Sequence, residues 1–374
     1  MIDEKRALDL LATLGDPAGP AGYDVGRAIR DGRRRRTRTR LAVAAGSAAA
    51  VVAVIAGGFA LVPARDAAPT PPAGLTPGPV HTLGPALTRI TRCVSERLPG
   101  PDDAFVSAGD PTGTFLAGRA GGRVALWQDG KYTAVDAPGA DPQVTGVNSR
   151  GVVIGNGQQE GGQPWAAAAG TVVPLPGPAG AVAAGIDEAG VVAGHRPQGA
   201  VEMPVIWDSV TAQPRDLPLP GGFVGGRALV VLPDGRIVGT AGTENVYRMQ
   251  KAVVWTADHS RAEVLAGPGG RTAGVLAAAD GWLLGNANGP ARYEMATGEW
   301  TALTGDIGLQ PLAINALGWV AGMDERDGRL FVHDGTRTRT PVRGAEALVV
   351  ATFSDDGRVL GGSQAGKATR WTCS

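Results

Sequence analysis

The chain has 374 residues, with 35 basic and 35 acidic side chains, 58 glycines and only 5% aromatic residues. The length allows two domains or one large repeat array. Ten basic and six acidic residues fall within positions 1–40, which leaves 25 basic and 29 acidic residues for the remainder. This balance excludes a large basic nucleic-acid-binding surface on the main domain.

Residues 1–40 are predicted to form a short, basic cytoplasmic tail. Apolar residues recur at near-helical spacing from Ile2 to Leu14, and Gly15 followed by Pro17 ends that pattern. The tail has two interpretations: residues 1–30 dock a cytoplasmic partner, or they are solvated and only fix the topology. The few lysines among many alanines and glycines are associated with high-GC, actinobacterial-like genomes.

Residues 41–63 are predicted to form one transmembrane helix. Leu41 to Val62 contains no charged residue and follows directly on a run of arginines. Twenty-two helical residues extend about 33 Å, enough for a hydrocarbon core of about 30 Å. The preceding cations predict a cytoplasmic N-terminus and an extracellular C-terminal part. A cleaved signal peptide is the alternative, although the charged leader and the apolar segment are both long for one.

Residues 64–88 are predicted to be an extended linker, because prolines alternate there with Ala, Gly and Thr. The segment 89–374 then repeats one pattern. Its clearest copies are Gly146-Val-Asn-Ser-Arg-Gly-Val-Val-Ile-Gly155, Gly185-Ile-Asp-Glu-Ala-Gly-Val-Val-Ala-Gly194 and Leu312-Ala-Ile-Asn-Ala-Leu-Gly-Trp-Val-Ala-Gly322.

The first glycine of each copy gives seven markers: Gly113, Gly151, Gly190, Gly235, Gly281, Gly318 and Gly357. A period near 40 residues with only strand signals inside it is typical of a β-propeller blade. We therefore predict an all-β fold with a seven-bladed β-propeller ectodomain, or six blades if the first, slipped copy is not a true repeat. Each marker glycine is expected to have a positive φ in a tight turn.

These copies resemble the HAF-type extracellular repeat of bacterial surface proteins, whose core reads Gly-Ile-Asn-x-x-Gly-x-Val-Val-Gly. The likeness covers about residues 105–371, good in three units and loose in four. The His-Ala-Phe tripeptide of that family is replaced here, for instance by Gln163-Pro-Trp165. The resemblance implies a propeller and an extracellular address, and no general catalytic activity.

One large side chain recurs after the second predicted strand of each unit. A ring at a fixed place is what radially packed sheets need to fill the gap between neighbours, so we predict blade packing; stacking on a sugar is the alternative. The predicted packing side chains are Trp127, Trp165, Trp207, Trp255, Tyr293, Phe331 and Trp371.

The last unit ends one strand short. Residues 90–98 resemble the missing outer strand and are predicted to pair with residues 368–373, which closes the ring. The only two cysteines, Cys93 and Cys373, fall on these two strands. Outside the cytoplasm they are expected to form a disulfide; two free buried thiols are the alternative.

No catalytic motif, metal site or cofactor site is predicted, since none of the four histidines has metal-ligand spacing. Two neighbouring units carry longer loops between their second and third strands, and such loops are candidate binding sites, or else tolerated surface insertions. The candidate ligand-binding residues are His195, Arg196, Glu244, Asn245, Tyr247 and Arg248.

The sequence thus predicts a single-pass protein of the bacterial cell membrane whose extracellular propeller is a non-catalytic binding module. Its predicted partners are the membrane and a surface protein, a cell-wall glycan or a secreted peptide, and not nucleic acid. The alternatives are a polysaccharide-directed hydrolase or lyase, with carboxylates that meet at the propeller mouth, and a receptor that signals through the tail.

Overall fold

The computed structural model describes residues 75, 78–137, 141–157, 162–243, 251–267, 273–286, 289–303, 309–342 and 348–374. The chain divides into two units, Met1–Thr70 and Pro71–Ser374, and the described residues belong to the second. The predicted tail and membrane span lie outside them. Within the described ranges, no helix is both long and apolar enough to cross a bilayer.

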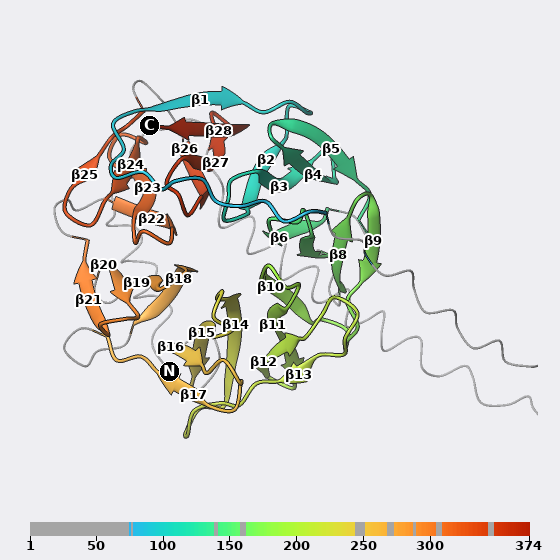
Figure 1. Cartoon of the computed structure of the whole chain (residues 1–374). Coiled ribbons are helices and arrows are strands. Elements are labelled where there is room, and N and C mark those ends of the chain that lie inside the picture. The colour runs from blue at the N-terminus through green and yellow to red at the C-terminus, as the bar shows by residue number, and fades with distance from the viewer. Residues whose placement is uncertain are drawn as a thin grey trace, which may run out of the picture. The chain divides into compact units, whose positions relative to one another are not determined.

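Seven four-stranded antiparallel sheets follow one another around a ring (Figure 1), which confirms the predicted seven-bladed propeller. Within each blade the chain runs from the innermost strand to the outermost, except in the last blade. The first three blades are β2 (Phe105–Gly109), β3 (Phe115–Ala120), β4 (Arg123–Gln128) and β5 (Lys131–Val135); β6 (Gln143–Val147), β7 (Val153–Asn156), β8 (Pro164–Ala168) and β9 (Thr171–Pro174); β10 (Val182–Ile186), β11 (Val192–Gln198), β12 (Val201–Trp207) and β13 (Arg215–Asp216).

The next three blades keep the same order. They are β14 (Gly225–Val231), β15 (Ile237–Gly242), β16 (Lys251–Trp255) and β17 (Ala262–Val264); β18 (Gly274–Ala279), β19 (Trp282–Asn286), β20 (Pro290–Glu294) and β21 (Glu299–Ala302); β22 (Leu309–Ile314), β23 (Val320–Asp324), β24 (Leu330–His333) and β25 (Thr338–Arg339).

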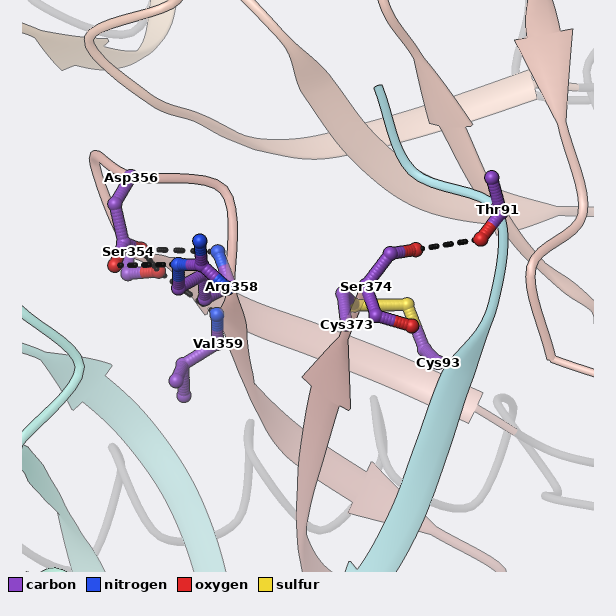
Figure 2. The surroundings of a disulfide bond; sticks show 8 residues. All are labelled: Thr91, Cys93, Ser354, Asp356, Arg358, Val359, Cys373 and Ser374. Carbon is purple, nitrogen blue, oxygen red and sulfur yellow. Dashed lines mark hydrogen bonds and ion pairs between the residues drawn. A yellow bond between two sulfur atoms is a disulfide. The ribbon is translucent and has the colours of Figure 1, made fainter. Parts of the chain in front are cut away.

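The seventh blade joins the two ends of the propeller. It consists of β26 (Leu348–Phe353), β27 (Val359–Gln364), β28 (Lys367–Cys373) and, as its outermost strand, β1 (Cys93–Arg97). Cys93 lies opposite Cys373 in the register, and the two sulfurs are bonded across a sequence separation of 280 residues (Figure 2). Both the predicted seam and the predicted disulfide are confirmed.

Each blade places a turn between its first and second strands, and we call it the motif turn; in the second blade it is residues 148–151. All seven marker glycines there have φ between 69° and 89°, as predicted. A side chain disfavours this region, so glycine makes the turn at little cost.

The hydrophobic core is divided into seven clusters, one between each pair of neighbouring blades. In the second, third, fourth and sixth blades, a bulky ring on the third strand packs against a glycine of the second strand. In the second blade, a Cβ on Gly155 would lie 2.3 Å from the Trp165 ring and 2.2 Å from the Gln143 carbonyl oxygen. In these four blades the second glycine of the copy therefore makes room for the ring.

Residues 78–92, which we call the strap, run from the motif turn of the second blade to that of the seventh before the chain enters β1 (Figure 1). The Gly78 amide donates to the Arg150 carbonyl oxygen (3.0 Å) in the second blade. The Leu87 amide donates to the Asp356 carbonyl oxygen (2.8 Å) in the seventh. Part of the segment that the sequence assigns to the linker is thus attached to the propeller.

Candidate functional site

A cavity of about 620 Å³ lies where the seven innermost strands meet, and residues of all seven line it. Each of these strands carries a β-bulge at an equivalent place. A bulge leaves one residue out of the ladder and bends the strand. All seven unpaired residues line the cavity: Ser107, Thr145, Ala184, Leu229, Leu276, Leu312 and Ala351.

This ring of bulge residues is polar or small on one side and apolar on the other. The Ser107 hydroxyl donates to the Val144 carbonyl oxygen (3.0 Å), and the Thr145 hydroxyl donates to the Ala183 carbonyl oxygen (2.9 Å). These hydroxyls therefore bond to the next blade. The fourth, fifth and sixth blades contribute leucines instead, and Leu276 is 55% exposed.

Carboxylates line the end of the cavity at the motif turns. They are Asp110, Asp187, Glu188, Asp280 and Asp355, and none of the described lining residues is basic. Burial raises the pKa of Asp110 and of Asp187 above the usual aspartate value. Burial raises the pKa of Asp355 to about 6, and the neighbouring charges of Asp280, Asp356 and Asp110 add to the shift. This end of the cavity therefore gathers five carboxyl groups with no basic side chain among the described lining residues.

The motif turns are also tied to one another around the ring. The Asn148 side chain accepts the amides of Arg150 (3.1 Å) and Val152 (3.0 Å), which closes its own turn. Its Nδ2 donates to the Asp187 carbonyl oxygen (2.9 Å) of the next blade. Asn148 thus links two blades while it shapes one turn.

The residue after each linking asparagine also donates to the next blade, through its backbone amide. The Glu188 carboxylate accepts the Ser149 amide (3.0 Å), and Asp355 accepts the Ala316 amide (2.9 Å). Two of the cavity carboxylates therefore hold adjacent blades together. In the second and sixth blades the asparagine side chain and the amide that follows it therefore both bond to the next blade.

The predicted ligand residues that the structure describes lie away from this cavity. His195 and Arg196 are on β11, which leads away from the motif turn toward its hairpin with β12, and neither lines the cavity. Glu244, Asn245, Tyr247 and Arg248 lie outside the described residues. The Arg196 guanidinium instead forms two bonds to the Asp216 carboxylate (2.8 and 2.7 Å) on β13 of its own blade.

His195 belongs to a cluster at the contact between the third and fourth blades. Its Nε2 lies 3.8 Å from the Glu202 carboxylate, and that carboxylate also accepts two bonds from Arg227. Burial lowers the pKa of His195 to about 4, so the imidazole is neutral at pH 7. Since Glu202 already accepts bonds from Arg227, the cluster has the character of an inter-blade ion pair.

The predicted packing side chains are at the contacts between blades. The five tryptophans of that set are 0% exposed and Phe331 is 1% exposed. Several of their indoles also donate to the preceding blade, as Trp255 Nε1 does to the Pro218 carbonyl oxygen (2.7 Å).

In the fifth blade two rings share this place. Tyr293 is only half-buried, and its ring centroid lies 5.1 Å from that of Trp300. The Trp300 indole donates to the Ala266 carbonyl oxygen (2.8 Å), which is the bond that Trp255 makes one blade earlier. Sequence spacing identifies Tyr293 and misses Trp300, which comes from the fourth strand.

Sequence reasoning did not find the cavity, since its lining consists of small residues, leucines and turn carboxylates that each have an ordinary structural role. The available signal was the Asp or Glu that follows or replaces the asparagine in several motif turns. Within the described residues, no group of three or more His, Cys, Asp or Glu is arranged to hold a metal ion.

No protein-family model matches the chain, and a search of curated proteins finds no match. Solved structures are similar in fold. A virginiamycin B lyase from Staphylococcus aureus, a catalytically inactive form with quinupristin, matches at a TM-score of 0.52 with 14% identity over 75% of this chain and 99% of the other. A chain of a mitotic checkpoint complex matches at 0.52 with 15% identity over 82% and 99%. A gluconolactonase from Xanthomonas campestris matches at 0.42 with 14% identity over 79% and 99%. At these identities the two matches with a TM-score of 0.52 show a shared fold alone.

Proposed function

We propose that the protein is a membrane-anchored, extracellular binding module of the bacterial surface, which takes its ligand in the central cavity. The observation that carries this proposal is the cavity itself. All seven blades line it, its volume of about 620 Å³ is in the range of ligand sites, and it combines apolar walls with convergent carboxylates.

The disulfide supports the extracellular address. Disulfides persist in oxidising compartments and are rare in the cytosol, and this one joins the only two cysteines of the chain. The charge-free segment 41–62 after a basic run, and the likeness of the motif turns to the HAF-type repeat, agree with an anchored surface protein.

The four lysines provide a test of the topology. Lys131 is exposed on the propeller, whereas Lys5 falls in the predicted cytoplasmic tail. A membrane-impermeant amine reagent is expected to label Lys131 on intact cells and to label Lys5 only after lysis. Peptide mass spectrometry measures both. Equal labelling of Lys5 on intact cells would contradict the proposed orientation.

Binding in the cavity can be tested in the same cells. A photo-cross-linking phenylalanine analogue in place of Leu276 is expected to capture a component of the envelope or the medium. The same analogue in place of Val94, which is 53% exposed on the outermost strand, serves as the control. Irradiation followed by mass spectrometry compares the adducts. Identical adducts at both positions would show that the cavity is not the binding site.

A hydrolase or lyase acting on polysaccharide is the second candidate. The specific observation is the pKa of Asp355, which burial raises to about 6 beside the ionisable groups of Asp280 and Asp110. A carboxyl group whose pKa is raised by burial beside other carboxyl groups is typical of a general acid. Binding is preferred because Asp355 already accepts the Ala316 amide between blades. A cleaved sugar at the cavity cross-link, in place of an intact component, would favour the enzyme.

A further inference from the structure

The cavity wall offers an apolar contact from three successive blades. Leu229, Leu276 and Leu312 occupy the bulge position in blades four to six, so their side chains form one continuous sector of the ring. Leu276 leaves 55% of its surface exposed on an innermost strand. An exposed leucine within a concave, leucine-lined sector is an unsatisfied apolar surface that a ligand can cover.

The opposite sector offers few free polar groups to a ligand. The two hydroxyl-bearing bulge residues, Ser107 and Thr145, already donate to carbonyl oxygens of the next blade. The remaining bulge residues there are alanines. The bulge residues therefore provide few free hydrogen-bonding side chains with which to recognise a sugar.

Charge is concentrated at one end. The carboxylates follow the bulge residues by three or four positions along the chain, which places them about 10 Å further along the strands. Most are engaged in the motif turns: Asp110, Asp187, Glu188 and Asp355 all accept backbone amides.

Asp280 differs from the other four. It is exposed, and within the described part of the chain it makes no hydrogen bond or ion pair. It also follows Leu276 by four residues in the same blade, so a free carboxylate and the most exposed leucine belong to one hairpin.

We infer that the central cavity binds a small organic cation whose apolar body lies against Leu229, Leu276 and Leu312 and whose protonated amine faces Asp280. The inference rests on the proposed binding function and specifies its ligand class. The lining favours a positively charged ligand, because the described lining residues include five carboxylates and no basic side chain. An amphipathic anion is disfavoured for the same reason.

The test uses three probes of one shape: 4-phenylbutylamine, 4-phenylbutanol and 4-phenylbutanoate. Calorimetric titration of the full chain in nanodiscs is expected to show the amine binding about fivefold more tightly than the alcohol, and the carboxylate most weakly. Asp280→Asn should weaken the binding of the amine about fivefold and leave the binding of the alcohol unchanged. Leu276→Ser should weaken amine and alcohol alike, by about tenfold.

Matched controls keep the outcome unambiguous. Asp136→Asn removes an exposed carboxylate outside the cavity lining, and Val94→Ser removes an exposed aliphatic side chain on the outermost strand; both should bind like the unchanged protein. If the alcohol or the carboxylate binds as tightly as the amine, the cation assignment is wrong, although the cavity still binds ligands as proposed. If no probe binds, or if Asp280→Asn has no effect on the amine, the inference is overturned, while the cellular cross-link still decides the proposed function.

Discussion

Replacing both Cys93 and Cys373 with alanine is expected to lower the free energy of unfolding by about 4 to 5 kcal/mol. The bond closes a loop of 280 residues, so its removal greatly increases the conformational freedom of the unfolded chain. Both cysteines are buried, at 5% and 2% exposure, and alanine fills their place without adding a polar group. Guanidinium denaturation followed by tryptophan fluorescence measures the change.

The reductant supplies the control. The unchanged protein, unfolded and refolded under reducing conditions, should fall to the stability of the double variant, and the variant itself should not respond to reductant. Coincident denaturation midpoints for the oxidised protein and the double variant would show that the hydrogen-bonded pairing of β1 with β28 alone closes the ring.

Asn315→Leu is expected to lower the free energy of unfolding by about 3 kcal/mol. Asn315 is 0% exposed, accepts the amides of Leu317 (3.1 Å) and Trp319 (3.0 Å), and donates to the Ser354 carbonyl oxygen (3.0 Å) of the next blade. Leucine has a similar size but leaves these backbone groups unpaired in the interior. Chemical denaturation measures the loss.

Asn315→Asp separates the two roles of this side chain. Aspartate keeps the acceptor for the turn, as Asp110 and Asp187 do in their own motif turns, replaces the donor to the next blade with an oxygen, and adds a carboxyl group that burial favours in its protonated form. We therefore expect a smaller loss, about 1 to 2 kcal/mol. A loss as large as that of the leucine variant would contradict this expectation, because the missing donor to Ser354 and the buried carboxyl group would then cost as much as the unpaired turn amides.

The ring and its closure could be predicted from the sequence because both depend on periodic features. The marker glycines recur wherever a turn needs positive φ, and a large aromatic side chain recurs where two blades meet. The two cysteines are not part of a periodic pattern. One lies on the strand before the first repeat and the other on the incomplete last repeat, and these positions predict their pairing.

The cavity could not be predicted because it depends on departures from strand alternation. A bulge shifts the alternation of side chains along a strand by one residue. Strict alternation therefore does not reveal that Leu276 lines the central cavity. The sequence spacing identifies Tyr293 and misses Trp300 for a related reason, since two strands of one blade supply aromatic rings to one gap. The long loop after the second strand favoured His195 and Arg196 as ligand-binding residues. That β11–β12 hairpin lies at the end of the blade opposite the motif turn and its carboxylates.

The order in which the strap, β1 and the disulfide follow one another determines how the propeller responds to tension applied through its N-terminal side. Such a pull first meets a few backbone bonds at the motif turns, of which those of Gly78 and Leu87 are typical, and these can be peeled away one at a time. The force then reaches Cys93, where a covalent bond passes it to Cys373 on β28. The strap can thus detach and extend under tension while the blades stay folded.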